Sequence, residues 1–285
     1  MLRSCSADEF VRYADHAYRL ATDPARSGYP TYCDGVKTKE MFVERSMKAF
    51  ERDTEQMFLF ESEGKVQGLI HLYRIPEDRY LGTCLFLTDR SAGQAVTEFL
   101  AYARENFPGY ELFTGFPAEN REAVKKLEEL GSECIESDYN NTSFLDTFGH
   151  IPETGDMVLI GKENYGLFQA LHSLTEGDMY WNSERILDDL DSWRIFVKEK
   201  DGKALGAVYC RDIRDGWFEI FGVDLESPVR DEELFRELLL ASVRDAAGRN
   251  GKVITFFCEE EYQKAAEECG LRCIGKYLCY KTVLS

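Results

Sequence analysis

The sequence predicts an α/β protein built as two consecutive domains, each with a mixed, mostly antiparallel sheet flanked by helices. Three observations carry this prediction. Strand-like and helix-like hydrophobic patterns alternate along the chain, the pattern of the first half returns in the second, and a stretch rich in glycine and proline separates the halves. The 285 residues, of which 44% are hydrophobic, are enough for two ordinary domains with packed cores.

The internal repeat rests on two matches at nearly the same offset. Gly-Lys-Val-Gln-Gly at 64–68 returns as Gly-Lys-Ala-Leu-Gly at 202–206, about 140 residues later. Residues 123–135 align with 262–274, and a lysine, two glutamates, a glycine, a cysteine and an isoleucine keep their places. The predicted parts are a first domain, a linker and a second domain, over 1–145, 146–156 and 157–285.

The first domain begins with two predicted helices. Residues 6–21 place apolar side chains at helical spacing, and Ser6 is a suitable N-cap. Residues 41–50 form the second helix. The segment 29–35 between them is aromatic and rich in turn residues, so it is either a lid over a bound substrate or a loop packed on the core.

A meander of three strands follows. Residues 57–60 and 66–73 have strand-like composition, and the Glu-Gly-Lys corner at 63–65 predicts a hairpin between them. Residues 80–87 form the third strand. The remaining elements alternate as helix 96–106, strand 111–116, helix 120–130, and strands 134–137 and 142–145.

The second domain repeats this order. Its elements are predicted over 157–160, 165–174, 183–190, 194–198, 204–210, 217–223, 232–247, 253–258, 262–269 and 273–284.

The charge and the cysteines limit the partners and the location. The chain has 52 acidic and 34 basic residues, a formal net charge of -18. A phosphate backbone and an anionic membrane surface both need a basic face, so we expect no nucleic-acid partner and no membrane partner. The sequence shows no secretory signal, and its nine cysteines include no Cys-x-x-Cys pair. We therefore expect reduced thiols, a cytoplasmic location and no metal.

The candidate functional segment joins the third strand to the next helix. It combines a positive charge with small residues at a helix start, where exposed main-chain N–H groups bind anions. Small residues there let a diphosphate approach the main chain. The candidate residues are Arg90, Ser91, Ala92, Gly93, Gln94 and Ala95.

The element order and this segment resemble the GCN5-related N-acetyltransferase family. The acetyl-CoA loop of that family reads Gln/Arg-x-x-Gly-x-Gly/Ala after its fourth strand. A second family feature, Asn-x-x-Ala at the start of the following helix with a glycine at its end, is matched by Asn120, Ala123 and Gly131. The resemblance covers the first domain well and the second domain as a fold only.

The resemblance implies an acetyl-CoA-dependent N-acyltransferase. The acetyl group would pass directly from acetyl-CoA, a co-substrate, to a primary amine of a small molecule or a peptide. Asn120 and the loop would hold the CoA. A main-chain N–H of the splayed strand, at Leu85, Phe86 or Leu87, would stabilise the thioester oxygen.

The acid and the base are less well matched. The family usually protonates the departing thiolate with a tyrosine seven residues after the asparagine, but Leu127 stands at that position. Tyr139 is the candidate substitute, and solvent is the alternative. Cys84, His71 and Glu111 are each candidate general bases, and each also fits an ordinary structural role.

The second domain departs from the family pattern. Glu233 takes the place of the loop glycine and Glu259 that of the asparagine, and carboxylates at these places repel a diphosphate. We therefore expect a second domain that keeps the fold and has lost the cofactor site. The alternative function is a catalytically decayed CoA-binding or structural protein. We expect a monomer or a homodimer.

Overall fold

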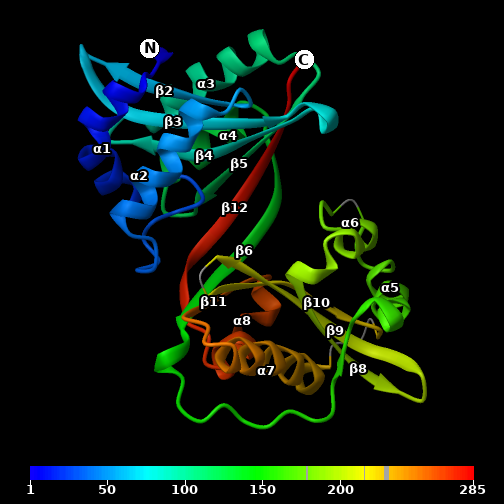
Figure 1. Cartoon of the computed structure of the whole chain (residues 1–285). Helices are drawn as coiled ribbons and strands as arrows, with labels where there is room; N and C mark the ends of the chain where they lie inside the picture. Colours follow the sequence, from blue (N-terminus) through cyan, green and yellow to red (C-terminus); the bar gives the residue numbers. More distant parts are fainter. Residues whose placement is uncertain (178, 215, 228–230) are drawn as a thin grey trace. The chain divides into compact units, whose positions relative to one another are not determined.

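The computed structural model describes residues 1–177, 179–214, 216–227 and 231–285. The chain forms two compact units: unit 1 comprises Met1–Asp138 and Gly275–Ser285, and unit 2 comprises Tyr139–Ile274. Each unit contains a mixed sheet with helices packed on it, so the predicted fold class is confirmed (Figure 1). Within the described ranges, the helices are too short or too polar to cross a membrane.

The sheet of unit 1 has the strand order β1-β2-β3-β4-β5-β12. Its neighbouring strands are antiparallel, except that β4 and β5 are parallel. The strands are β1 (Leu2–Ser4), β2 (Glu55–Ser62), β3 (Lys65–Ile75), β4 (Tyr80–Thr88), β5 (Glu111–Pro117) and β12 (Cys273–Val283).

Two pairs of helices cover the two faces of this sheet, because successive side chains of a strand point to opposite faces. In β4, Leu85 and Leu87 pack with α1 (Ala7–Ala21) and α2 (Lys39–Met47). The intervening Phe86 packs with the helices of the other face, which are α3 (Ala92–Asn106) and α4 (Arg121–Glu129).

The predicted N-cap of the first helix is confirmed. The Ser6 hydroxyl accepts a hydrogen bond from the N–H of Glu9, and the Glu9 carboxylate accepts one from the N–H of Ser6. Such a capping box satisfies two of the donors that a helix start leaves unpaired.

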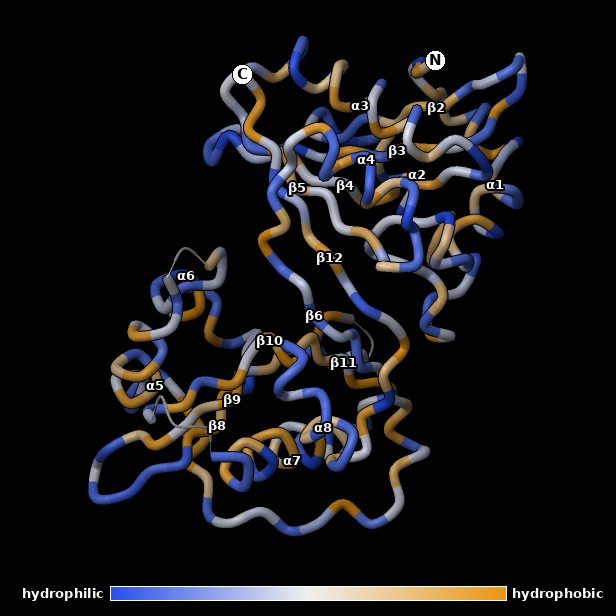
Figure 2. The backbone as a smooth tube through the Cα atoms, turned by 180° about the vertical axis from the view of Figure 1, so that it is seen from behind, coloured by the Kyte–Doolittle hydropathy of each residue, from blue (hydrophilic) through white to orange (hydrophobic). Residues whose placement is uncertain are grey.

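Unit 2 has the strand order β6-β11-β10-β9-β8-β7, and only β10 and β11 are parallel. Its strands are β6 (Glu133–Phe144), β7 (Val158–Leu159), β8 (Trp193–Lys200), β9 (Lys203–Arg214), β10 (Trp217–Leu225) and β11 (Val253–Cys258). Its helices are α5 (Tyr165–His172), α6 (Ser183–Asp188), α7 (Glu232–Gly248) and α8 (Glu260–Glu268). Apolar stretches within α7, visible in Figure 2, place Phe235, Leu239 and Val243 in the core of unit 2.

The two halves of the chain exchange their last strands. Residues 139–144 of β6 pair with β11 of unit 2, whereas residues 277–283 of β12 pair with β5 of unit 1. The expected linker at 146–156 therefore lies inside unit 2, and the end of the chain belongs to unit 1. The aligned repeat ends at Ile135 and Ile274, before the residues that pair, so it does not predict which sheet each strand joins.

One predicted break in a strand is wrong. Residues 134–137 and 142–145 were expected as separate strands, but β6 is continuous from Glu133 to Phe144. An asparagine favours a turn when its side chain bonds its own local backbone. Here the Asn141 side chain donates to the local carbonyl of Tyr139 at 3.2 Å and also to the carbonyl of Phe256 in the neighbouring strand at 3.3 Å, and the pairing of residues 139–144 with β11 keeps the segment extended.

Candidate functional site

The candidate site of unit 1 begins where β4 and β5 separate. The two strands pair only over Tyr80–Gly82 and Glu111–Phe113, although both continue further. The register between β3 and β4 also shifts in this region, which leaves Cys84 as an extra residue in β4. We call the place between Thr83–Thr88 and Thr114–Pro117, where this pairing has stopped, the strand gap.

The strand gap is filled by the chain itself. Residues 26–29, from the connection between α1 and α2, lie against β4 like a short antiparallel strand. The N–H of Gly28 donates to the carbonyl of Phe86 at 2.7 Å, and the N–H of Thr88 donates to the carbonyl of Arg26 at 2.9 Å.

Two further hydrogen bonds fasten the same segment on its other side. The N–H of Tyr29 donates to the carbonyl of Gly115 in β5 at 2.8 Å. The side-chain amide of Asn120 donates to the carbonyl of Ser27 at 3.1 Å. Asn120 was predicted to hold a cofactor; it is buried, caps α4 and holds this segment.

The predicted loop at 90–95 lies at the start of α3, as its sequence indicated. Ser91 adopts the left-handed conformation with φ 60° and has no side-chain cap bond, so the helix starts without a capping hydroxyl. The N–H of Gly93 donates to a carboxylate oxygen of Glu122 at 3.0 Å. A side chain at position 93 would start 3.3 Å from Cε of Lys126. Arg90 is exposed.

The two residues weighed for the acid, Leu127 and Tyr139, both have structural contacts. Leu127, at the usual place of the acid, is buried in the core beneath α4. Tyr139 belongs to unit 2, where it pairs with Cys258 in the β6–β11 ladder. Its role as the acid stays a prediction. The third base candidate, Glu111, forms a salt bridge with Lys281 at 2.8 Å.

His71 and Cys84 lie together in a polar cluster that the sequence did not reveal. Nε2 of His71 lies 2.8 Å from Oε2 of Glu55, and both residues are buried. Arg45 donates to Glu55 at 2.9 Å and to Sγ of Cys84 at 3.1 Å, and Arg52 donates to Glu55 at 2.7 Å.

The protonation states in this cluster follow from burial and from the two arginines. Burial lowers the pKa of His71, so its imidazole is neutral and donates to the carboxylate. Burial alone would raise the pKa of Glu55, but the hydrogen bonds from His71 and the guanidinium groups hold it well below its usual value. Burial raises the pKa of Cys84 to about 11, so the thiol keeps its proton.

The cluster also has donors of the kind that bind metal. Ligand atoms of Glu55, His71 and Cys84 lie within 4.8 Å of one another. A divalent cation there would meet the guanidinium groups of Arg45 and Arg52, which already neutralise the carboxylate. The cluster is better explained as an ion-paired network that ties α2 to the sheet.

We expect Glu55→Gln to lower the free energy of unfolding of unit 1 by about 3 kcal/mol, because it leaves a partly buried guanidinium without its counter-charge. All three tryptophans of the chain lie in unit 2, so tryptophan fluorescence should not report the destabilisation of unit 1. Hydrogen exchange of the β2 and β3 amides should report it. Glu51→Gln, at an exposed position nearby, is the control. Equal stabilities of the two variants would contradict the prediction.

In unit 2 the equivalent helix start is closed by a carboxylate. Asp231 is the N-cap of α7, and its side chain accepts a hydrogen bond from the N–H of Leu234 at 3.0 Å. Of the two residues that depart from the family pattern, Glu233 lies in the first turn of α7, and Glu259 is the N-cap of α8 without a side-chain cap bond. A carboxylate also lies at the start of α3 in unit 1, so the loss of the diphosphate site in the second domain stays a prediction.

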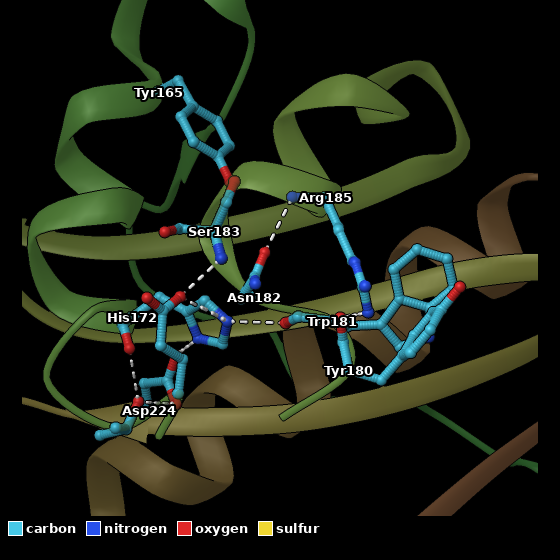
Figure 3. Close-up of polar contacts among 10 residues, drawn as sticks. Tyr165, His172, Tyr180, Trp181, Asn182, Ser183, Arg185 and Asp224 are labelled. Carbon is cyan, nitrogen blue, oxygen red and sulfur yellow. Dashed lines mark hydrogen bonds and ion pairs between the residues drawn. The ribbon is translucent and has the colours of Figure 1, made fainter. Parts of the chain in front are cut away.

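A buried histidine lies at the end of β10 (Figure 3). Nδ1 of His172 is 2.8 Å from the Asp224 carboxylate, and Nε2 is 3.0 Å from the carbonyl of Trp181. Both partners are acceptors, so both nitrogens donate only when the imidazole is protonated. Burial alone would lower the pKa of His172, but the hydrogen bond and charge of Asp224, the Trp181 carbonyl and the nearby Glu176 raise it.

This histidine predicts a pH dependence of unit 2. Because the pKa of His172 is higher in the folded state, its protonation contributes to the free energy of unfolding. This contribution is fully present below the ordinary histidine pKa of about 6.5 and is lost as the pH rises through the folded-state pKa. Urea unfolding followed by tryptophan fluorescence should therefore show the wild type losing stability above pH 6.5. His172→Gln should lack this slope, and a slope that persists in the variant would refute the assignment.

Comparisons with known proteins agree on one fold. No family model matches the chain, and no curated protein does. Among solved structures, a GCN5-related N-acetyltransferase from Sphaerobacter thermophilus is similar, with a TM-score of 0.66, 15% identity and coverage of 99% of this chain and 95% of that chain. A tandem GNAT protein from the clavulanic acid biosynthesis pathway has a TM-score of 0.56 at 12% identity and covers 99% and 98%. An acetyltransferase of the GNAT family from Colwellia psychrerythraea has a TM-score of 0.51 at 13% identity and covers 99% of both.

Proposed function

The chain has the fold of the GCN5-related N-acetyltransferases, and from this premise we propose that it is an N-acyltransferase that uses acetyl-CoA. The acetyl group passes directly to a primary amine of a small molecule or a peptide. The fold supports the reaction class, and the segment at 90–95 supports the donor.

One observation carries the donor assignment. The N–H of Gly93 already holds an anionic oxygen, that of the Glu122 carboxylate. The carboxylate occupies the place that a diphosphate oxygen would take at this helix start. Arg90 is exposed, and glycine at position 93 puts no side chain between its N–H and a larger anion that replaces the carboxylate.

The chemistry needs little from side chains. The neutral amine attacks the thioester carbonyl, a C–N bond forms, and the C–S bond breaks as the CoA thiolate leaves. Main-chain N–H groups of β4, over Leu85, Phe86 and Leu87, are the proposed donors to the carbonyl oxygen. The ammonium proton goes to solvent or to a base, and the thiolate takes a proton from solvent.

Two measurements test this function. Titration calorimetry should detect acetyl-CoA binding, and a thiol-release assay should detect turnover with at least one member of a panel of polyamines, aminoglycosides, amino acids and peptides. Binding without turnover on the whole panel would favour a CoA-binding protein. Absence of both would overturn the proposal.

The alternative function, that of a catalytically decayed structural protein, has its own supporting observation. Residues 26–29 occupy main-chain groups of β4 and β5 that a CoA arm would otherwise reach. A catalytically decayed, structural protein would have such a filled strand gap permanently.

A further inference from the structure

We propose that unit 1 carries its own competitor for acetyl-CoA: residues 26–29 together with the Glu122 carboxylate. This internal ligand closes the donor site, and acetyl-CoA has to expel it in order to bind. The inference rests on the proposed function and adds a closed state to it.

The internal ligand meets the donor site at two points. In the strand gap it accepts a hydrogen bond from the N–H of Thr88 and donates one to the carbonyl of Phe86, both within the predicted CoA strand. At the start of α3 the Glu122 carboxylate accepts from Gly93. Residues 26–29 thus take the place proposed for the extended part of CoA, and the Glu122 carboxylate takes the place proposed for its diphosphate.

The closed state has a built-in defect. Ser27 has 0% of its surface exposed, and its hydroxyl makes no hydrogen bond with any residue that the structure describes. A buried hydroxyl without a partner is costly. Beyond the hydrogen bonds named above, the ion pairs of Arg26 with Asp23 and Asp89 add little, because their side chains are partly exposed to solvent. Glu122 is exposed as well, so its carboxylate can leave for water.

The closed state also depends on a glycine. A Cβ on Gly28 would lie 2.9 Å from Cβ of Phe86 and 3.0 Å from the carbonyl oxygen of Gly115. Neither neighbour is the far end of a flexible side chain. The backbone of Gly28 is not left-handed, so alanine can adopt it once the segment leaves the gap.

Substitutions of the adjacent residues Ser27 and Gly28 should change the affinity for acetyl-CoA in opposite directions. The apparent dissociation constant equals the intrinsic one divided by the open fraction. Ser27→Ala removes the unpaired hydroxyl, stabilises the closed state and should weaken acetyl-CoA binding about fivefold. Gly28→Ala crowds the closed state and should tighten binding by at least about fivefold. Gly166→Ala, in α5 where a Cβ meets nothing within 4 Å, is the control and should leave binding unchanged.

The carboxylate is tested separately. Glu122→Gln should tighten acetyl-CoA binding, because a neutral amide competes less well for the N–H of Gly93. Glu105→Gln removes the same charge at the other end of α3 and should have the smaller effect. An equal effect of both variants would show that only net charge matters and would overturn the role of Glu122.

Hydrogen exchange supplies a readout that needs no activity. Acetyl-CoA should speed exchange of the Gly28 and Tyr29 amides, because the segment leaves its partners. Gly28→Ala should do so without acetyl-CoA. Equal acetyl-CoA affinities for the wild type, Ser27→Ala and Gly28→Ala would overturn the closed state and leave the proposed function standing. Folded variants that all fail to bind acetyl-CoA would overturn both and identify residues 26–29 as a permanent filling.

Discussion

A chain that ends at Ile274 should retain a folded unit 2 and lose unit 1. The deletion removes β12 residues that pair with β5 over Glu111–Pro117, and it removes Tyr280 and Leu284 from the core of unit 1. Each of these side chains is almost fully buried, and truncation of one such side chain costs about 2–5 kcal/mol. Their combined loss is comparable to the whole stability of a domain, about 5–15 kcal/mol.

Tryptophan fluorescence and hydrogen exchange together check this result. The tryptophan signal, which arises only in unit 2, should stay native, whereas β2 to β5 should exchange rapidly. Deletion of the exposed Ser285 alone is the control and should change neither signal. Protected amides in β5 of the shortened chain would show that unit 1 does not need β12.

The double variant Arg90→Glu, Gly93→Glu should show no measurable acetyl-CoA binding. Both changes put negative charge where the diphosphate is proposed to lie. A pair of unit charges 4 Å apart near a protein surface interacts with about 4 kcal/mol, roughly a thousandfold in affinity. The fold should survive, because Arg90 is exposed and the nearest neighbours of a side chain at position 93 are the flexible Lys126 and Glu122.

Titration calorimetry compares this variant with the wild type and with Arg12→Glu. Arg12 is exposed on α1, so its replacement changes the charge of unit 1 away from the proposed site. Arg12→Glu should bind acetyl-CoA nearly as the wild type does. Unchanged affinity in the double variant would refute the donor site at the start of α3.

Local features of this molecule were readable from short stretches of sequence. Ser6 caps α1, residues 63–65 form a hairpin corner, and Gly131 adopts the positive φ of a helix end. Each depends on a few neighbouring residues. The buried cluster of Glu55, His71 and Cys84 was not readable, since its members come from three strands and give no spacing signal.

The sequence by itself determined the α/β fold class, most of the helices and strands, and the position of the 90–95 segment at the start of α3, because hydrophobic period, caps and turns act over a few residues. Only the tertiary structure decided which sheet each last strand joins and what lies in the strand gap. Those outcomes are main-chain hydrogen bonds between residues far apart in sequence, and main-chain groups are the same in every residue. Which partner each main-chain group finds depends on packing between distant segments, such as Tyr280 and Leu284 in the core of unit 1 and the close approach at Gly28, so no short stretch of sequence predicts it.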